Sequence, residues 1–213
     1  MLPTVSTGSV RYLRPLHGSR DWFWGTDCTD GDLYEAEELY RLRHKTDRTR
    51  LILVRDADRR VFEPVSPKTG QYFGVPIFHA GAPLILLADF PEGVIRVLRF
   101  DAESGETKQV LELPRAAFDD CYNLQLHVSP LMLTRQTSEH FQILWPYAAD
   151  FSIEPTESFD TREAERLYFS RWHETPDYWE DTVVRDARTG AVLEILPGAL
   201  CLLPDGRSWL LTE

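Results

Sequence analysis

VIRVLRFDAESGETKQVLELP, residues 94–114, is the stretch that decides the fold class. Its two ends are rich in valine, isoleucine and leucine, and short runs of this kind bounded by turn residues are typical of β-strands. Between them, DAESG places Asp101 where its side chain can cap a turn and Gly105 where the backbone φ is expected to be positive. The stretch therefore predicts an antiparallel hairpin.

The same hairpin recurs along the chain. It is repeated as DTVVRDARTGAVLEILP at residues 181–197 and, with the glycine replaced, as LILVRDADRRVFEPV at residues 51–65. Weaker copies are VRYLRP at residues 10–15 and FQILWP at residues 141–146. A second match, EAEELYRLRHKTD at residues 35–47 and EAERLYFSRWHETPD at residues 163–177, precedes two of the hairpins. Five copies of about 43 residues account for the whole chain.

This repeat predicts an all-β protein: a small β-propeller of five blades of about 43 residues, forming a single domain over residues 1–213. Residues 32–45 contain good helix formers. We nevertheless predict a strand there, because the matching copy carries Tyr168, Phe169 and Trp172, which favour strands.

The frame of the repeat decides which strands line the central channel. We take the strands that follow each hairpin as innermost, at residues 35–43, 73–78, 122–126, 163–171 and 199–202. In this frame the C-terminal strands at residues 199–202 and 208–212 share a blade with N-terminal strands at residues 10–13 and 21–24. Such sharing closes the ring and removes an exposed sheet edge. The alternative frame gives five unbroken blades without that closure.

The DAxxG–strand rhythm resembles the propeller repeat of quinoproteins. The similarity covers the rhythm alone, because the tryptophan that such repeats place after the glycine is missing at residues 110–112 and 193–195. We therefore infer no cofactor from the resemblance.

Composition restricts the partners. The formal net charge of −11 repels polyanions, so we expect neither nucleic acid nor an anionic membrane surface as a partner.

No stretch approaches the roughly 18 apolar residues of a membrane helix, and the N-terminus lacks a signal-peptide pattern. Cys28, Cys121 and Cys201 form an odd set without CxxC spacing, which favours a reducing compartment. We expect a cytoplasmic protein.

Four histidines fall where a predicted innermost strand meets its turn: His44, His79, His127 and His173. Innermost strands of a propeller are parallel to one another, so these turns would open at one mouth of the channel. Imidazoles gathered there can bind a metal or an anion, or titrate near neutral pH. The alternative is that exposed turns merely tolerate histidine, and Leu203 occupies the fifth position. We assign no metal from the sequence.

Two duplicated groups of charged residues lie on the same predicted inner strands: Glu35, Glu37 and Arg43 in one copy, and Glu163, Glu165 and Arg171 in the other. Carboxylates facing each other across a channel are what glycoside hydrolysis requires. Duplication favours a structural role instead, as cross-strand pairs of glutamate and arginine.

The sequence contains no GxSxG, Walker or GxGxxG motif. We therefore predict a non-enzymatic binding or scaffolding module, whose partner is an unidentified protein or small molecule. The alternatives are an enzyme resembling glycoside hydrolases, and a sensor of metals or small ligands at the histidine mouth.

Overall fold

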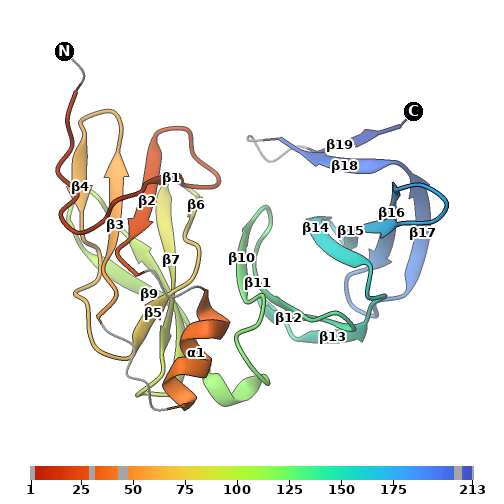
Figure 1. The fold of residues 1–213 in the computed structure, drawn as a ribbon, viewed down its shortest axis with the longest axis horizontal. Coiled ribbons are helices and arrows are strands. Elements are labelled where there is room, and N and C mark those ends of the chain that lie inside the picture. The colour runs from red at the N-terminus through yellow and green to blue at the C-terminus, as the bar shows by residue number, and fades with distance from the viewer. Residues whose placement is uncertain (1–2, 29–31, 43–47, 204–207, 213) are drawn as a thin grey trace. The chain divides into compact units, whose positions relative to one another are not determined.

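The computed structural model describes residues 3–28, 32–42, 48–203 and 208–212 (Figure 1). The described chain consists mainly of antiparallel β-strands, which confirms the all-β prediction. It divides into two compact units, residues 1–121 and 122–213, each described below by itself. No helix in these ranges is long and apolar enough to cross a membrane.

The first unit contains two sheets. One has the order β1-β2-β3-β4, with bounds Arg14–Pro15, Trp22–Thr26, Leu51–Arg55 and Arg60–Phe62. The other has the order β5-β7-β8-β9, with bounds Gln71–Phe73, Ala82–Asp89, Val94–Phe100 and Thr107–Pro114. Strand β6, Ile77–His79, also pairs with β7, and a 3₁₀ turn follows at Arg115–Ala117.

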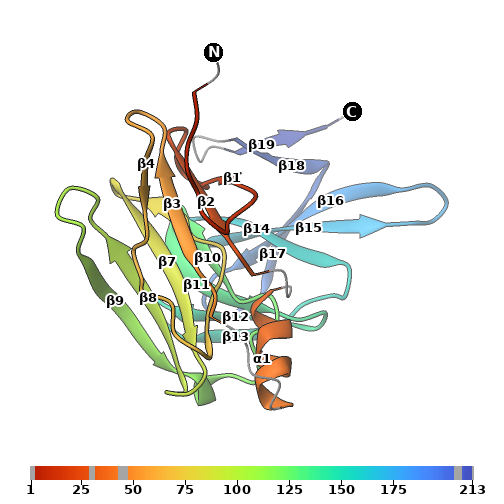
Figure 2. The same ribbon diagram turned by 60° about the vertical axis from the view of Figure 1, so that its left-hand side comes forward.

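The second unit contains two four-stranded sheets and a hairpin. The first of these sheets comprises β10 to β13, with bounds Gln125–Val128, Leu131–Gln136, His140–Trp145 and Ala149–Ser152. The next comprises β14 to β17, with bounds Glu157–Glu163, Arg166–His173, Trp179–Asp186 and Val192–Pro197. Strands β18, Ala199–Leu202, and β19, Ser208–Leu211, form a two-stranded sheet. Strands in each four-stranded sheet follow one another in sequence order (Figures 1 and 2).

The repeated hairpin forms as predicted and joins the third and fourth strands of a sheet. It connects β3 to β4, β8 to β9 and β16 to β17. Asp101 Oδ1 accepts the backbone N–H groups of Glu103 and Ser104, and Gly105 has a φ of +73°. In the last copy Asp186 caps the turn in the same way, and Gly190 has a φ of +71°. The aspartate and the glycine thus have the roles that their spacing predicted.

The strand predicted over residues 35–43 is wrong, because the segment forms helix α1, Leu33–Arg41. Asp32 caps this helix: its Oδ1 accepts the N–H groups of Tyr34 and Glu35 at 2.9 and 3.0 Å. The Glu35 side chain accepts the Asp32 N–H at 2.9 Å in return, which completes a capping box. Leu33 and Ala36 bury one face of the helix, so burial and capping both favour the helix.

The described sheets do not include the predicted blade shared by the two ends of the chain. Both edges of β2 are occupied, by β1 and β3, and β18 pairs with β19. Residues 10–13 form no strand, although Val10 is buried. The strand predicted over residues 163–171 is instead the end of β14, a tight turn and most of β15. Within these ranges no sheet closes on itself, and each four-stranded sheet uses consecutive segments as in the alternative frame.

An aromatic core holds the two sheets of the second unit together. Phe141 packs edge-on against Phe169, with ring centroids 5.1 Å apart, and both rings are fully buried. Phe151 packs on both. The sheet β10–β13 and the sheet β14–β17, which are the third and fourth sheets of the chain, therefore share one core.

Substitutions of two glycines in the repeated turn can distinguish the effect of backbone strain on stability from the effect of packing. A Cβ on Gly190 would lie 2.1 Å from Phe151 Cγ, whereas one on Gly105 would meet nothing within 4 Å. Gly105→Ala should lower the free energy of unfolding by about 1 kcal/mol, because alanine is strained in the left-handed backbone conformation of Gly105. Gly190→Ala should cost roughly 1–3 kcal/mol more, because of the overlap. Denaturant titration followed by circular dichroism measures both, and equal losses would contradict the packing described here.

Candidate ligand-binding cleft

The second unit contains a cleft of about 520 Å³. It is formed by the ends of β14 and β15 and part of β17 on one side and by the hairpin β18–β19 on the other. The residues that line it are Ser129, Thr161, Arg162, Glu163, Tyr168, Leu196, Leu200, Ser208, Trp209 and Leu210. Its volume falls within the roughly 300–1,000 Å³ that is usual for small-molecule sites.

One part of the cleft is apolar and aromatic. Tyr168 comes from β15, whereas Trp209 and Leu210 come from β19. The Trp209 side chain is 56% exposed and that of Leu210 is 37% exposed. Large apolar side chains left accessible beside a cavity are a usual mark of an interaction site. A ligand with an aromatic or aliphatic body can pack on them.

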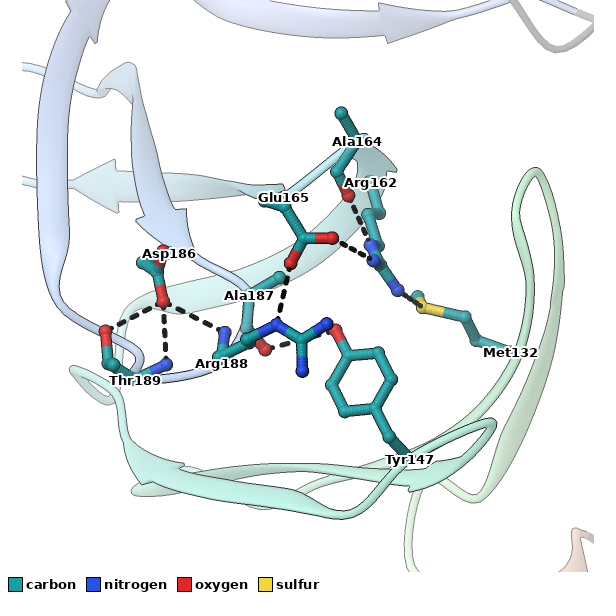
Figure 3. Close-up of polar contacts among 9 residues, drawn as sticks. All are labelled: Met132, Tyr147, Arg162, Ala164, Glu165, Asp186, Ala187, Arg188 and Thr189. Atoms are coloured by element: carbon teal, nitrogen blue, oxygen red, sulfur yellow. Dashed lines mark hydrogen bonds and ion pairs between the residues drawn. The ribbon is translucent and has the colours of Figure 1, made fainter.

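Arg162, at the end of β14, brings positive charge to the cleft. Its side chain is 11% exposed. Its Nε donates to the Ala164 carbonyl at 2.6 Å, one Nη to the Met132 sulfur at 3.6 Å, and the other Nη to Glu165 at 3.5 Å (Figure 3). Only the first of these contacts is a short hydrogen bond to oxygen. The guanidinium is therefore held in place, and the described residues leave much of its donor capacity unused.

Two tight turns bring a second arginine next to Arg162. The turn between β14 and β15 has Ala164 at a φ of +52° and places Glu165 at its tip. The Glu165 carbonyl accepts the N–H of Ala187, in the turn between β16 and β17. Arg188 consequently donates to Glu165 at 3.2 Å, so one carboxylate lies between two guanidiniums (Figure 3).

Tyr147 supports this pair of arginines. The guanidinium carbons of Arg162 and Arg188 lie 5.1 and 5.2 Å from the centre of its ring, within the range of cation–π attraction. The Tyr147 hydroxyl donates to the Ala187 carbonyl at 3.2 Å, and burial raises the pKa of Tyr147. The ring is thus fixed as a neutral platform beneath both cations (Figure 3).

A buried carboxyl group lies at the bulge of β14. The register of β14 against β15 shifts between Phe159 and Thr161, which leaves Asp160 unpaired. Burial raises the pKa of Asp160 to about 6, and the nearby charge of Glu180 adds to this, although hydrogen bonds from Ser170 oppose it. Asp160 Oδ2 is buried without a hydrogen-bond partner in the described part of the chain.

The described histidines of the predicted mouth belong to both units, and the mouth stays a prediction. His79 ends β6, His127 lies inside β10, and His173 ends β15, which is the second strand of its sheet. The prediction placed all four histidines at the ends of innermost strands. The described ranges contain no group of three or more histidine, cysteine or acidic side chains able to hold a metal. His44 lies outside these ranges.

Two of these histidines have structural partners instead. His127 Nε2 lies 2.7 Å from Thr134 Oγ1, and its ring packs edge-on against Phe159. His173 stacks on Trp179 with ring centroids 3.7 Å apart.

The duplicated acids do not occupy equivalent places. Glu37 is buried on helix α1, where it pairs with Arg115 and Arg41 and accepts the Cys121 N–H at 2.7 Å. Glu165 lies in a strand turn of the other unit. The two copies therefore do not form the predicted set of matching cross-strand pairs.

Arg171 has a structural partner in its own sheet. Arg171 forms two hydrogen bonds with Asp181, at 2.9 and 2.6 Å, and Arg43 lies outside the described ranges. Among the described candidate residues of the second unit, Glu163 lines the cleft and Glu165 contacts Arg162 there.

The central residues of the cleft, Arg162, Tyr168 and Trp209, were not predicted as site residues. The available signal was the charged run Arg162-Glu163-Ala164-Glu165, in which only the acids were considered. The chain matches no known protein-family profile and no curated protein.

Asp160 predicts a dependence of stability on pH. The folded state holds this proton more tightly than the unfolded chain, so the free energy of unfolding should fall as the pH rises from about 4 to about 6. Asp160→Asn should lack this contribution, and the exposed control Asp177→Asn should keep it. Urea titrations across this pH range measure the difference. Identical pH profiles for the wild type and Asp160→Asn would contradict the assignment.

Proposed function

We propose that this protein is a non-enzymatic binding module that holds a small ligand in the cleft between its fourth sheet and the hairpin β18–β19. The observation that carries this proposal is the lining of the cleft. It combines accessible aromatic and aliphatic side chains with one firmly held cation and several hydroxyl groups. Sites that combine apolar surface with precisely placed polar groups are typical of ligand recognition.

The carboxyl groups support binding rather than hydrolysis. Glycoside hydrolysis needs two carboxyl groups that flank the scissile bond. Among the described residues that line the cleft, Glu163 has the one carboxyl side chain. Glu37, a predicted candidate, is engaged by Arg115, Arg41 and the Cys121 amide. We therefore favour binding over a hydrolytic enzyme.

We also propose that residues 1–213 form a single small β-propeller of five blades of about 43 residues. Support comes from the repeated hairpin and from the four-stranded antiparallel sheets, whose strands are consecutive in the chain. A binding site at the side of one blade is compatible with such an architecture.

The propeller proposal can be tested by small-angle X-ray scattering. A single compact domain of this length should have a radius of gyration of about 17 Å, and it should unfold in one cooperative transition. A clearly larger radius, together with two separate unfolding transitions, would mean that the two units are independent domains.

The binding proposal can be tested by saturation-transfer NMR with a panel of small aromatic and aliphatic compounds, including 3-phenylpropionate and 3-phenylpropanol. For each compound that the wild type binds, Trp209→Ala should weaken binding roughly tenfold, since an aromatic contact surface is lost. Trp172→Ala is the matched control, because Trp172, on β15, is 40% exposed but does not line the cleft. Equal effects of both substitutions would contradict this site.

A further inference from the structure

We infer that the ligand of this cleft is a monocarboxylate, whose carboxylate binds Arg162 and whose aromatic or aliphatic body lies against Trp209. The inference rests on the proposed binding function and specifies its ligand class.

The unused donors of Arg162 carry the argument. A guanidinium has five N–H donors in a planar fork. Among the described residues, the Ala164 carbonyl is the one acceptor within 3 Å, and the other two contacts are a sulfur at 3.6 Å and a carboxylate at 3.5 Å. Donors that are largely removed from water need strong acceptors. A ligand carboxylate can accept two of them at once, in the bidentate geometry that arginine favours.

The charge balance around Arg162 also favours an anion. Its ion-pair partner among the described residues is Glu165, but Glu165 lies closer to Arg188, at 3.2 Å, than to Arg162, at 3.5 Å. One carboxylate thus serves two guanidiniums, and it is 57% exposed, so water weakens its attraction. Arg162 therefore keeps much of its positive charge for a ligand.

Glu163 restricts the ligand to a single negative charge. This residue is exposed and also lines the cleft. A dianionic group such as a phosphate monoester would be attracted by Arg162 and repelled by Glu163. A monocarboxylate can place its one charged group on Arg162 and turn its uncharged body away from Glu163.

The rest of the lining matches such a body. Tyr168, Trp209 and three leucines provide the apolar surface. Hydroxyl groups of Ser129, Thr161 and Ser208 also line the cleft and can donate to carboxylate oxygens.

Arg162 is fixed before the ligand arrives. The Ala164 carbonyl holds its Nε, and the Tyr147 ring supports its guanidinium plane. An arginine that is already oriented loses little conformational entropy on binding, which increases affinity.

The test compares two probes of similar shape by titration calorimetry at neutral pH and low salt. The probes are 3-phenylpropionate, which carries a carboxylate, and 3-phenylpropanol, which carries a hydroxyl group. The wild type should bind the acid at least about tenfold more tightly than the alcohol, since hydrogen bonds between ions are stronger than neutral ones. Added salt should reduce this preference.

Arg162→Gln should abolish the preference by weakening the binding of the acid at least about tenfold. Arg166→Gln is the matched control: it removes the same charge from the same hairpin, where Arg166 is 53% exposed and pairs with Glu194 outside the cleft. Circular dichroism checks that both variants fold. If Arg162→Gln unfolds, Arg162→Lys serves instead: it keeps the charge but loses the fork, so acid binding should weaken while a smaller preference remains.

The outcomes separate this inference from the proposed function. If the wild type binds the alcohol as tightly as the acid, or if no folded Arg162 variant weakens acid binding, the carboxylate inference is wrong and the binding function stands. If neither probe nor any compound of the panel binds at millimolar concentration, both are wrong. A preference for the acid that only the Arg162 variants reduce supports the inference.

Discussion

The contact between Phe141 and Phe169 is the interaction on which the second unit depends. Both rings are fully buried, and Phe151 packs on both of them. Phe151 also lies against Gly190, where a side chain would overlap it. The aromatic core therefore fixes the turn between β16 and β17, and with it the position of Arg188. This packing therefore sets the geometry of the candidate cleft.

The buried side chains of Glu157 and Arg185 in the fourth sheet pair with each other. Glu157 and Arg185 form two hydrogen bonds of 2.9 Å each, and Arg185 also donates to the Gly190 carbonyl. An isolated charge at such buried positions would be strongly destabilising. In the cleft the situation differs, because Arg162 has one short contact and two long ones. This contrast between a satisfied and an unsatisfied arginine separates structural support from a candidate binding group.

Similar sequences in this chain adopt different structures. Asp32 precedes Glu35 by three residues, and Asp160 precedes Glu163 by three, so both copies carry the same local signal for a helix start. The first copy forms a capped helix and the second a bulged strand. Phe169 in the second copy is required in the aromatic core, and this tertiary contact overrides the local preference.

The sequence by itself determined the strand-rich fold and the repeated turn, because both depend on local chemistry. Asp101 and Gly105, like Asp186 and Gly190, specify the hairpin through side-chain capping and positive φ alone. Only the tertiary structure decided which residues meet at the cleft. Arg162 and Trp209 are far apart in sequence, and their common lining depends on how β19 folds against the fourth sheet. Distances between residues that are far apart in sequence are set by the packing and register of strands. They cannot be read from the order of residues along one strand.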